Sequence, residues 1–191
     1  MTSDLGLSAM LRILCLGNEL LADDAFGPVV AEGLRRAFPH LDVVFTTDSG
    51  LDLLEYLTET DLLVVVDTIQ TGKVPTGTLY VAGISDIKTP LGPSPHYIGL
   101  LEALQVAKEL LLKVPDDVII LAVEAADCLT LGGTMHVAVQ AAVGLAIDLV
   151  REISMEWKPA SVRLDKDSGG GLMRAIMAVT ARWGSERFVV I

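Results

Sequence analysis

The chain has 191 residues, with 14 Lys or Arg against 25 Asp or Glu, so its formal net charge at pH 7 is -11. Binding to a phosphate backbone depends on clustered basic side chains, so we do not expect this acidic chain to bind nucleic acid. Apolar residues make up 51% of the chain, which excludes a disordered polypeptide and is enough for one large core.

From the sequence we expect neither a membrane span nor a secretory signal. Its longest apolar runs are far shorter than the ~20 residues needed to cross a bilayer, and no membrane partner is expected. The first ten residues lack a basic segment followed by an apolar one. Two cysteines, Cys15 and Cys128, are too few for a disulfide framework. These features predict a cytoplasmic protein.

Apolar runs rich in Val, Ile and Leu alternate with helical patterns along the chain. Strands are predicted at residues 12–16, 42–47, 61–67, 77–82 and 118–123. Helices are predicted at residues 25–38, 51–57, 97–113 and 136–153. The continuous Leu/Val run of residues 61–67 is typical of a central parallel strand that is buried on both faces.

This alternation predicts an α/β fold: one three-layer domain over residues 1–156, with a mostly parallel central sheet of about five strands and helices on both faces. Residues 157–191 differ in character and are predicted to be a C-terminal extension. Its segment 172–183 has a helical pattern, and the extension is either a docked helix or a partly mobile tail.

Three segments bring chemically active side chains to one end of this sheet. Ligands of such sheets bind beyond the carboxyl ends of the strands, where the strand order reverses, and the first and third strands commonly flank that point. The loop after the first strand carries Asp23 and Asp24, the third strand ends in Asp67, and Ser94-Pro95-His96 precedes a helix. Two carboxylates and an imidazole together are typical of a divalent-metal or acid/base site.

Each of these residues also has a purely structural interpretation. Asp23 or Asp24 could cap the following helix, Asp67 could belong to a turn, and His96 could cap its helix. Glu124, which ends the fifth strand, could support the same edge of the sheet. The placement of all of them at one end of the sheet favours a site.

Three stretches in this order resemble the hydrogenase maturation proteases, which trim the C-terminal extension from the large subunit of nickel-iron hydrogenases. The stretches are ILCLGNELLADDAFGPVVAEGL, LLVVVDTIQTGKVPTGTLY and SPHYIGL, within residues 12–150. Their shared pattern combines Gly-Asn-x-Leu-x-x-Asp-Asp, a strand-ending Asp and Ser-Pro-His.

The resemblance implies that Asp24, Asp67 and His96 are the catalytic and metal-recognition triad of an endopeptidase. The metal is nickel already inserted in the large-subunit precursor, so the nickel-loaded precursor is the expected partner and no tightly bound metal is expected in the free enzyme. Asp23 is expected to orient its loop, and one carboxylate to act as general base. The other supporting residues are Gly17, Asn18, Gly50 and Glu124.

The sequence departs from the family pattern at two places. Ala25 stands where the family most often has Gly, and residues 46–50 replace an Asp-Gly-Gly-Thr-type loop while keeping Gly50. The altered loop keeps open a second function, that of a non-catalytic module binding a metallo-subunit or small ligand. A free-standing metallohydrolase and an α/β domain without activity are further alternatives.

Overall fold

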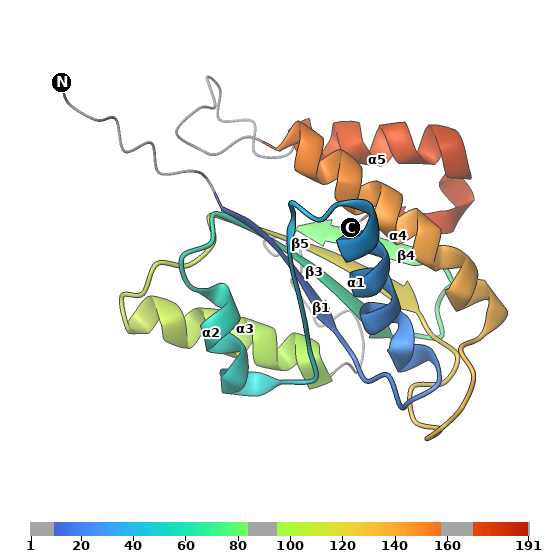
Figure 1. Ribbon diagram of the computed structural model, residues 1–191, viewed down its shortest axis with the longest axis horizontal. Helices are drawn as coiled ribbons and strands as arrows, with labels where there is room; N and C mark the ends of the chain where they lie inside the picture. The colour runs from blue at the N-terminus through green and yellow to red at the C-terminus, as the bar shows by residue number, and fades with distance from the viewer. Residues whose placement is uncertain (1–9, 84–94, 158–169, 191) are drawn as a thin grey trace.

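A six-stranded sheet forms the centre of the computed structural model (Figure 1), which describes residues 10–83, 95–157 and 170–190. Residues 95–98 and 170–172 are described as backbone only. The sheet order is β2-β1-β3-β5-β4-β6. The strands are β1 (Leu11–Leu16), β2 (Asp42–Thr46), β3 (Leu62–Ile69), β4 (Leu79–Gly83), β5 (Asp117–Glu124) and β6 (Phe188–Val190). Only β4 and β5 pair antiparallel among these strands, which confirms the predicted α/β fold.

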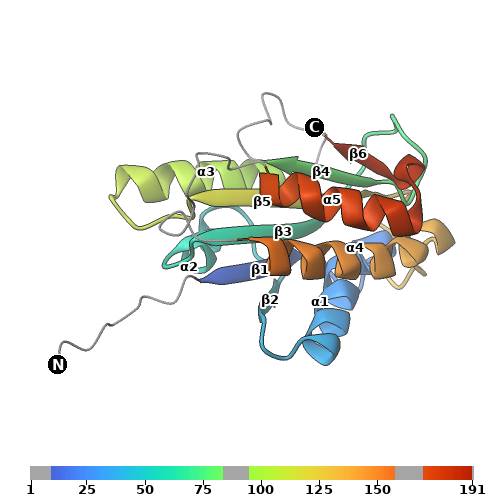
Figure 2. The same cartoon turned by 90° about the horizontal axis from the view of Figure 1, so that it is seen from above.

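Helices cover both faces of the sheet, as Figure 2 shows. One layer contains α1 (Phe26–Ala37), α4 (Val137–Glu156) and α5 (Gly170–Trp183). The other contains α2 (Leu54–Leu57) and α3 (Pro95–Glu109). Successive side chains of a strand point to opposite faces, so Val64 and Val66 of β3 pack in the α1 layer, whereas Leu63 and Val65 pack in the α3 layer. The Leu/Val run is therefore buried on both faces, as predicted.

The strands β1 and β3 lie side by side at the centre, with β2 beyond β1 and β5 beyond β3. The chain leaves β1 towards one side of the sheet and returns through β3 to the other. The predicted reversal of strand order between the first and third strands is thereby confirmed. We call the end of the sheet where β1, β2, β3 and β5 finish the carboxyl edge, and the opposite end the amino edge.

Two predicted boundaries are wrong in ways that bear on the site. Asp67 does not end its strand, because pairing with β5 continues through Thr68 opposite Val123 to Ile69 opposite Glu124. The helix predicted from residue 97 begins at Pro95, so His96 lies in its first turn; proline is well tolerated there because its missing N–H would have no partner in the helix. Ser94 lies outside the described residues.

The C-terminal extension contributes a helix and a strand. The helix α5 packs on α4, where Asp148 accepts hydrogen bonds from Arg182 (3.0 Å) and the Trp183 indole (2.9 Å). A short 3-10 turn, Ser185–Arg187, leads to β6, which pairs parallel with β4 and adds an edge strand that the sequence analysis did not anticipate. Within the described residues, no helix has the length and apolar character required to span a membrane.

Candidate functional site

The loop after β1 returns towards the strand through two close backbone contacts. A Cβ atom on Gly17, whose φ is +139°, would stand 2.2 Å from the Asp24 carbonyl oxygen, and one on Gly27 would stand 1.9 Å from the Leu16 carbonyl oxygen. The Asn18 amide also donates to the Asp24 carbonyl (3.1 Å). These contacts require glycine, and they hold Asp24 at the carboxyl edge, between β1 and the start of α1.

Asp24 and Asp67 meet the same residue, Thr68. The Thr68 hydroxyl donates to Asp24 Oδ1 (2.8 Å), and the Thr68 amide donates to Asp67 Oδ1 (2.7 Å). Asp67 is completely buried, and Asp24 is 7% exposed. An isolated buried carboxylate is unfavourable unless hydrogen bonds or charges compensate for its lost hydration. Thr68 provides part of this compensation to both acids. Its role in the site was not predicted from the sequence.

Asp23 holds the loop that follows β5. Its Oδ2 accepts from the amides of Ala126 (2.7 Å) and Asp127 (2.9 Å), and its Oδ1 accepts from the His136 amide (2.6 Å). With 1% exposure, this side chain is directed inward. The neighbouring helix starts use no side-chain cap, so the capping interpretation of Asp23 and Asp24 is wrong.

Glu124, the last residue of β5, is a fourth buried acid at this edge. Its Oε1 accepts from the amides of Thr71 and Gly72, both at 2.8 Å. Its Oε2 accepts from the hydroxyls of Thr71 (2.6 Å) and Tyr80 (3.1 Å). Burial and the negative charge of Glu124 raise the pKa of Tyr80, although the hydrogen bond between the Tyr80 and Thr71 hydroxyls lowers it. Glu124 thus fixes the turn that follows β3.

The helix that carries His96 is seated on the loop that contains Gly50. A Cβ atom on Gly99 would stand 2.3 Å from the Gly50 amide nitrogen, so the two backbones touch directly. Gly50 has a φ of +61°, which glycine adopts most readily. His96 lies three residues before Gly99, in the first turn of α3, and its side chain lies outside the described part of the structure.

Cys128 lies close to the same acids. Burial raises the pKa of its thiol to about 12; the Thr68 hydroxyl beside it lowers the pKa, while the charges of Asp24, Asp23 and Asp67 raise it further. Cys128 is therefore a neutral thiol at physiological pH. Its proximity places the loop after β5 next to the end of β3.

The described side chains do not by themselves form a metal site. Among them, no group of three His, Cys, Asp or Glu residues is arranged to hold a metal ion. The His96 imidazole is not among the side chains covered by that statement. The structure brings Asp23, Asp24 and Asp67 to the carboxyl edge, and it sets Glu124 at the end of the adjoining strand.

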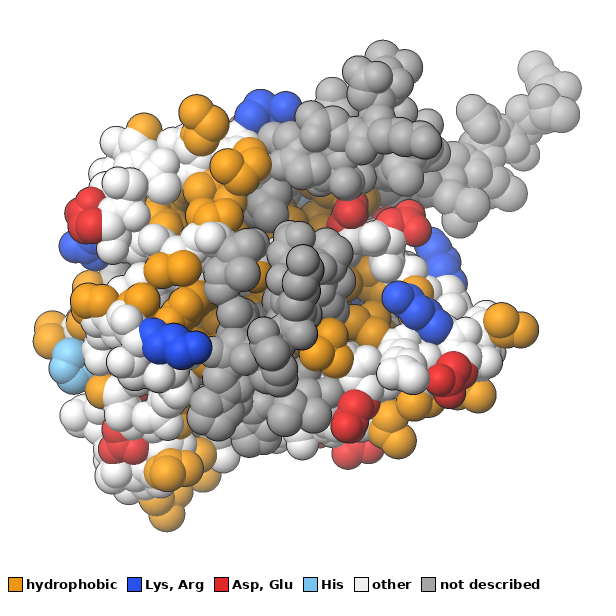
Figure 3. Space-filling view, turned by 180° about the vertical axis from the view of Figure 1, so that it is seen from behind, with side chains coloured by type: hydrophobic (Ala, Val, Ile, Leu, Met, Phe, Trp, Pro, Cys, Tyr) orange, Lys and Arg blue, Asp and Glu red, His pale blue; other side chains and the backbone are white. Residues whose placement is uncertain are grey.

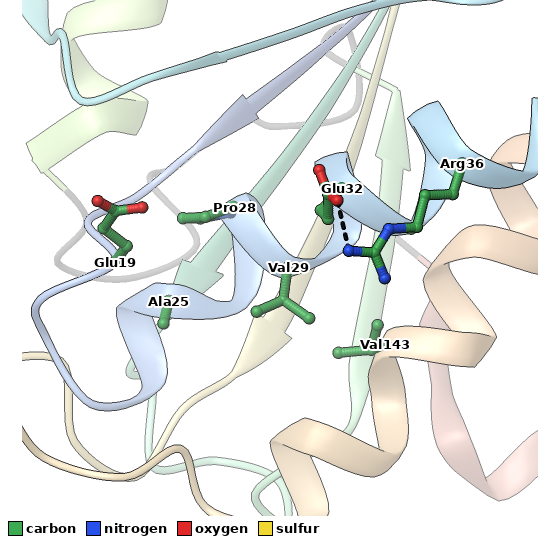
Figure 4. Close-up of a pocket in the computed structure, with 8 residues that line it drawn as sticks. Glu19, Ala25, Pro28, Val29, Glu32, Arg36 and Val143 are labelled. Carbon is green, nitrogen blue, oxygen red and sulfur yellow. Dashed lines mark ion pairs between the residues drawn. The ribbon is translucent and has the colours of Figure 1, made fainter. Parts of the chain in front are cut away.

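A groove of about 450 Å³ runs beside this edge (Figure 4). It lies along α1 and is lined by Glu19, Ala25, Pro28, Val29, Glu32, Gly33, Arg36 and Val143. Arg36 pairs with Glu32 at 2.7 Å. The acids of the carboxyl edge do not line the groove, although Glu19 follows Asn18 directly, so the groove adjoins the candidate site without containing it.

The loops around the acids carry exposed leucines. The segments 20–23 and 127–132 are joined by backbone hydrogen bonds, including Gly132 N–H to Leu20 O (2.7 Å), and Leu21 and Leu131 form a β-bridge. Leu20, Leu131 and Leu129 are exposed, with Leu129 at 83%. Hydrophobic atoms mark the protruding lower-left corner of Figure 3, where the loop after β5 lies. We call Leu20, Leu129 and Leu131 the leucine surface.

Comparison with known proteins gives a consistent result. A family model described as hydrogenase maturation protease matches residues 29–153. The chain is 30% identical over 151 residues to the hydrogenase expression/formation protein HupD of Bradyrhizobium diazoefficiens, covering 76% of this chain and 78% of that protein. It is 30% identical over 105 residues to the hydrogenase 2 maturation protease of Escherichia coli, covering 51% and 64% respectively.

Solved structures show the same fold. The hydrogenase maturating endopeptidase HybD from E. coli aligns with a TM-score of 0.63 at 23% identity, over 74% of this chain and 89% of that one. A [NiFe] hydrogenase maturation protease HybD from Thermococcus kodakarensis aligns with a TM-score of 0.62 at 24% identity, over 75% and 98%. At these identities the likeness establishes the architecture.

Proposed function

The chain belongs to the hydrogenase maturation protease family and is an endopeptidase, and we propose that its substrate is the precursor of a nickel-iron hydrogenase large subunit. In this proposal the enzyme removes the C-terminal extension of the precursor after nickel has been inserted. One observation carries the assignment to this site: the buried acids Asp24 and Asp67 share a hydrogen-bonding partner at the edge where β1 and β3 finish.

The nickel belongs to the substrate in this proposal. Asp24, Asp67 and His96 would contact it at positions that the precursor leaves open. The metal would polarise the scissile carbonyl or lower the pKa of an attacking water. The carboxylates suit this role because they lie together at the carboxyl edge, with neutral hydrogen-bond donors and a neutral thiol beside them.

The leucine surface supports a protein substrate. It is built on the same two loops that carry Asp24 and the Asp23-bound amides, so a polypeptide that places its metal near the acids comes close to these side chains. Exposed apolar side chains gain free energy when a partner covers them. We further propose a cytoplasmic location, which is supported by the presence of only two cysteines, both free thiols.

A non-catalytic binding module is the second candidate, favoured by the loop of residues 46–50. There Asp48 accepts from the Tyr56 hydroxyl (2.6 Å), and its amide donates to Thr46 Oγ1 (3.0 Å). The hydrogen bond from Tyr56 lowers the pKa of Asp48. The segment that replaces the glycine-rich loop of the family therefore presents a carboxylate held by a tyrosine, which alters the surface offered to a ligand.

Incubation of nickel-loaded precursor with the purified protein separates the two candidates. The endopeptidase shortens the large subunit by its C-terminal extension, as measured by intact-protein mass spectrometry, whereas the binding module leaves its mass unchanged. Asp67→Ala and His96→Ala should remain folded and leave the precursor uncut. Normal trimming by both variants would show that Asp67 and His96 are not needed for cleavage and would refute the proposed triad.

A further inference from the structure

We propose that Thr68 is a positioning residue that fixes the carboxylates of Asp24 and Asp67 relative to each other. This inference rests on the proposed function, since it concerns the same two acids. Thr68 contacts both of them through different atoms, its hydroxyl and its backbone amide. It is 4% exposed, so water has little access to compete for these bonds.

The geometry of β3 explains how one residue reaches both acids. Leu63, Val65 and Ile69 pack in the α3 layer, and alternation along the strand places Asp67 on that same face. Thr68 projects to the other face, towards α1, where it meets Asp24. The side chains of Asp67 and Thr68 therefore point to opposite faces of β3, and Thr68 reaches Asp24 with its hydroxyl and Asp67 with its backbone amide.

The chemistry of the hydroxyl makes the link directional. A threonine hydroxyl has one proton to donate, and here it is directed at Asp24 Oδ1. Hydrogen bonds to charged acceptors are roughly twice as strong as those between neutral groups, so this bond restrains the Asp24 carboxylate. The hydrogen bond donated by the Thr68 backbone amide restrains the Asp67 carboxylate in the same way. One oxygen of each acid is thus fixed by Thr68, which sets the direction in which the rest of each carboxylate faces.

A purely structural role for Thr68 makes a different prediction. Threonine is a good strand former, and a buried hydroxyl that only satisfies a neighbour would affect folding stability without affecting the reaction. Thr60 provides a matched control, because it is also buried and its hydroxyl donates to the Thr58 carbonyl at the amino edge, away from the acids.

The test compares Thr68→Val, Thr68→Ser and Thr60→Val in the full chain, with nickel-loaded precursor as the substrate. Valine keeps the shape of threonine but removes the donor, so we expect kcat/KM to fall about 10- to 100-fold, mainly through kcat, as for other residues that orient metal-binding groups. Thr68→Ser should restore most of the rate. Thr60→Val should cleave like the wild type. Thermal unfolding checks that each variant is folded, and Thr68→Ala provides a second donor-free variant.

Three results would overturn the proposal: a wild-type rate for Thr68→Val, an equal loss in Thr68→Ser, or an equal loss in Thr60→Val. A crystal structure of Thr68→Val gives a decision that does not depend on activity. The proposal expects the Asp24 carboxylate to rotate or become disordered, and an unchanged carboxylate contradicts it. Failure of the wild type to cut the precursor would refute the proposed function, whereas the position of Asp24 in the variant would still decide the role of Thr68.

Discussion

Two acids at the amino edge of the sheet pair with basic side chains, whereas Asp23, Asp24 and Glu124 at the carboxyl edge accept hydrogen bonds from neutral donors. At the amino edge, Arg12 pairs with Asp42 (2.8 Å) and Lys113 with Asp61 (2.7 Å). At the carboxyl edge, no ion pair between described residues involves Asp23, Asp24 or Glu124.

This difference separates two uses of a carboxylate. An exposed ion pair contributes little free energy and joins neighbouring elements. Burying a carboxylate without a basic partner costs free energy because the carboxylate loses its hydration. Amides and hydroxyls must then replace the lost water contacts. A site arranged in this way keeps negative charge available for a cation that arrives from outside. The hydrogen bonding of Asp23, Asp24 and Glu124 supports the proposal of a substrate that carries its metal with it.

Neutralising an acid at the carboxyl edge should produce the largest effect. Asp24→Asn and Asp67→Asn should each slow cleavage of the nickel-loaded precursor roughly 100- to 10,000-fold, because a metal contact or a proton acceptor is lost. The measurement is the rate of conversion to the short large subunit, followed by mass. Asp42→Asn at the amino edge is the control and should retain the wild-type rate. A comparable loss of cleavage rate in this variant would show that the acids of the carboxyl edge have no special role in the reaction.

Removing Asp23 should affect folding most strongly. Asp23→Ala leaves three backbone amides without their acceptor, so the free energy of unfolding should fall by about 3 kcal/mol. Urea denaturation followed by circular dichroism measures this change. Asp127→Ala removes the acceptor of the Leu129 and Thr130 amides in an exposed part of the same loop, and it should cost less. The reverse order would show that Asp23 does not hold the loop.

Changing the leucine surface should weaken substrate binding more than the chemical step. Leu129→Ser and Leu131→Ser should each raise KM about 3- to 10-fold with little change in kcat, because burial of a leucine contributes on the order of 1 kcal/mol or more. Steady-state cleavage kinetics measure both constants. Leu111, 92% exposed near the amino edge, provides the control. An equal rise in KM for Leu111→Ser would mean that exposed leucines act nonspecifically.

The smallest effect is expected from the ion pair at the amino edge. The hydrogen bond from Lys113 lowers the pKa of Asp61 below its ordinary value of 3.8. Because the folded-state pKa is the lower one, the stabilisation is present above pH 3.8 and is lost as the pH falls through the folded-state pKa. Asp61→Asn should therefore reduce Tm at pH 7 by about 1–2 °C and have less effect near pH 3. An equal reduction of Tm at both pH values would show that the ion pair between Asp61 and Lys113 is not the cause of the change.

The positions of the buried acids could be predicted from sequence, but their partners could not. Asp67 and Glu124 stand out because each closes or nearly closes a Leu/Val run. Asp23 and Asp24 stand out as adjacent acids after a strand. Their hydrogen-bond partners lie 44 and 103 to 113 residues away along the chain, so only the fold brings them together.

The residues missed by sequence analysis look ordinary in sequence. Thr68 is a β-branched residue in a strand, and Gly99 is a glycine in a helix; neither pattern indicates a role in a site. Gly99 matters because α3 touches the backbone at Gly50, which precedes it by 49 positions in the chain. The strand β6 is also hard to predict from sequence. Three residues are too few to show the alternation of a strand, and β6 is recognised only by its pairing with β4.

If the carboxyl edge recognises nickel carried by the precursor, cleavage must depend on that nickel. This dependence is tested most directly by offering the purified enzyme the same large-subunit precursor with nickel and without it, and measuring the mass of the product. We expect only the nickel-loaded form to be shortened, and we expect Asp67→Asn to cut neither form at a comparable rate. Equal cleavage of both forms by the wild type would contradict this dependence.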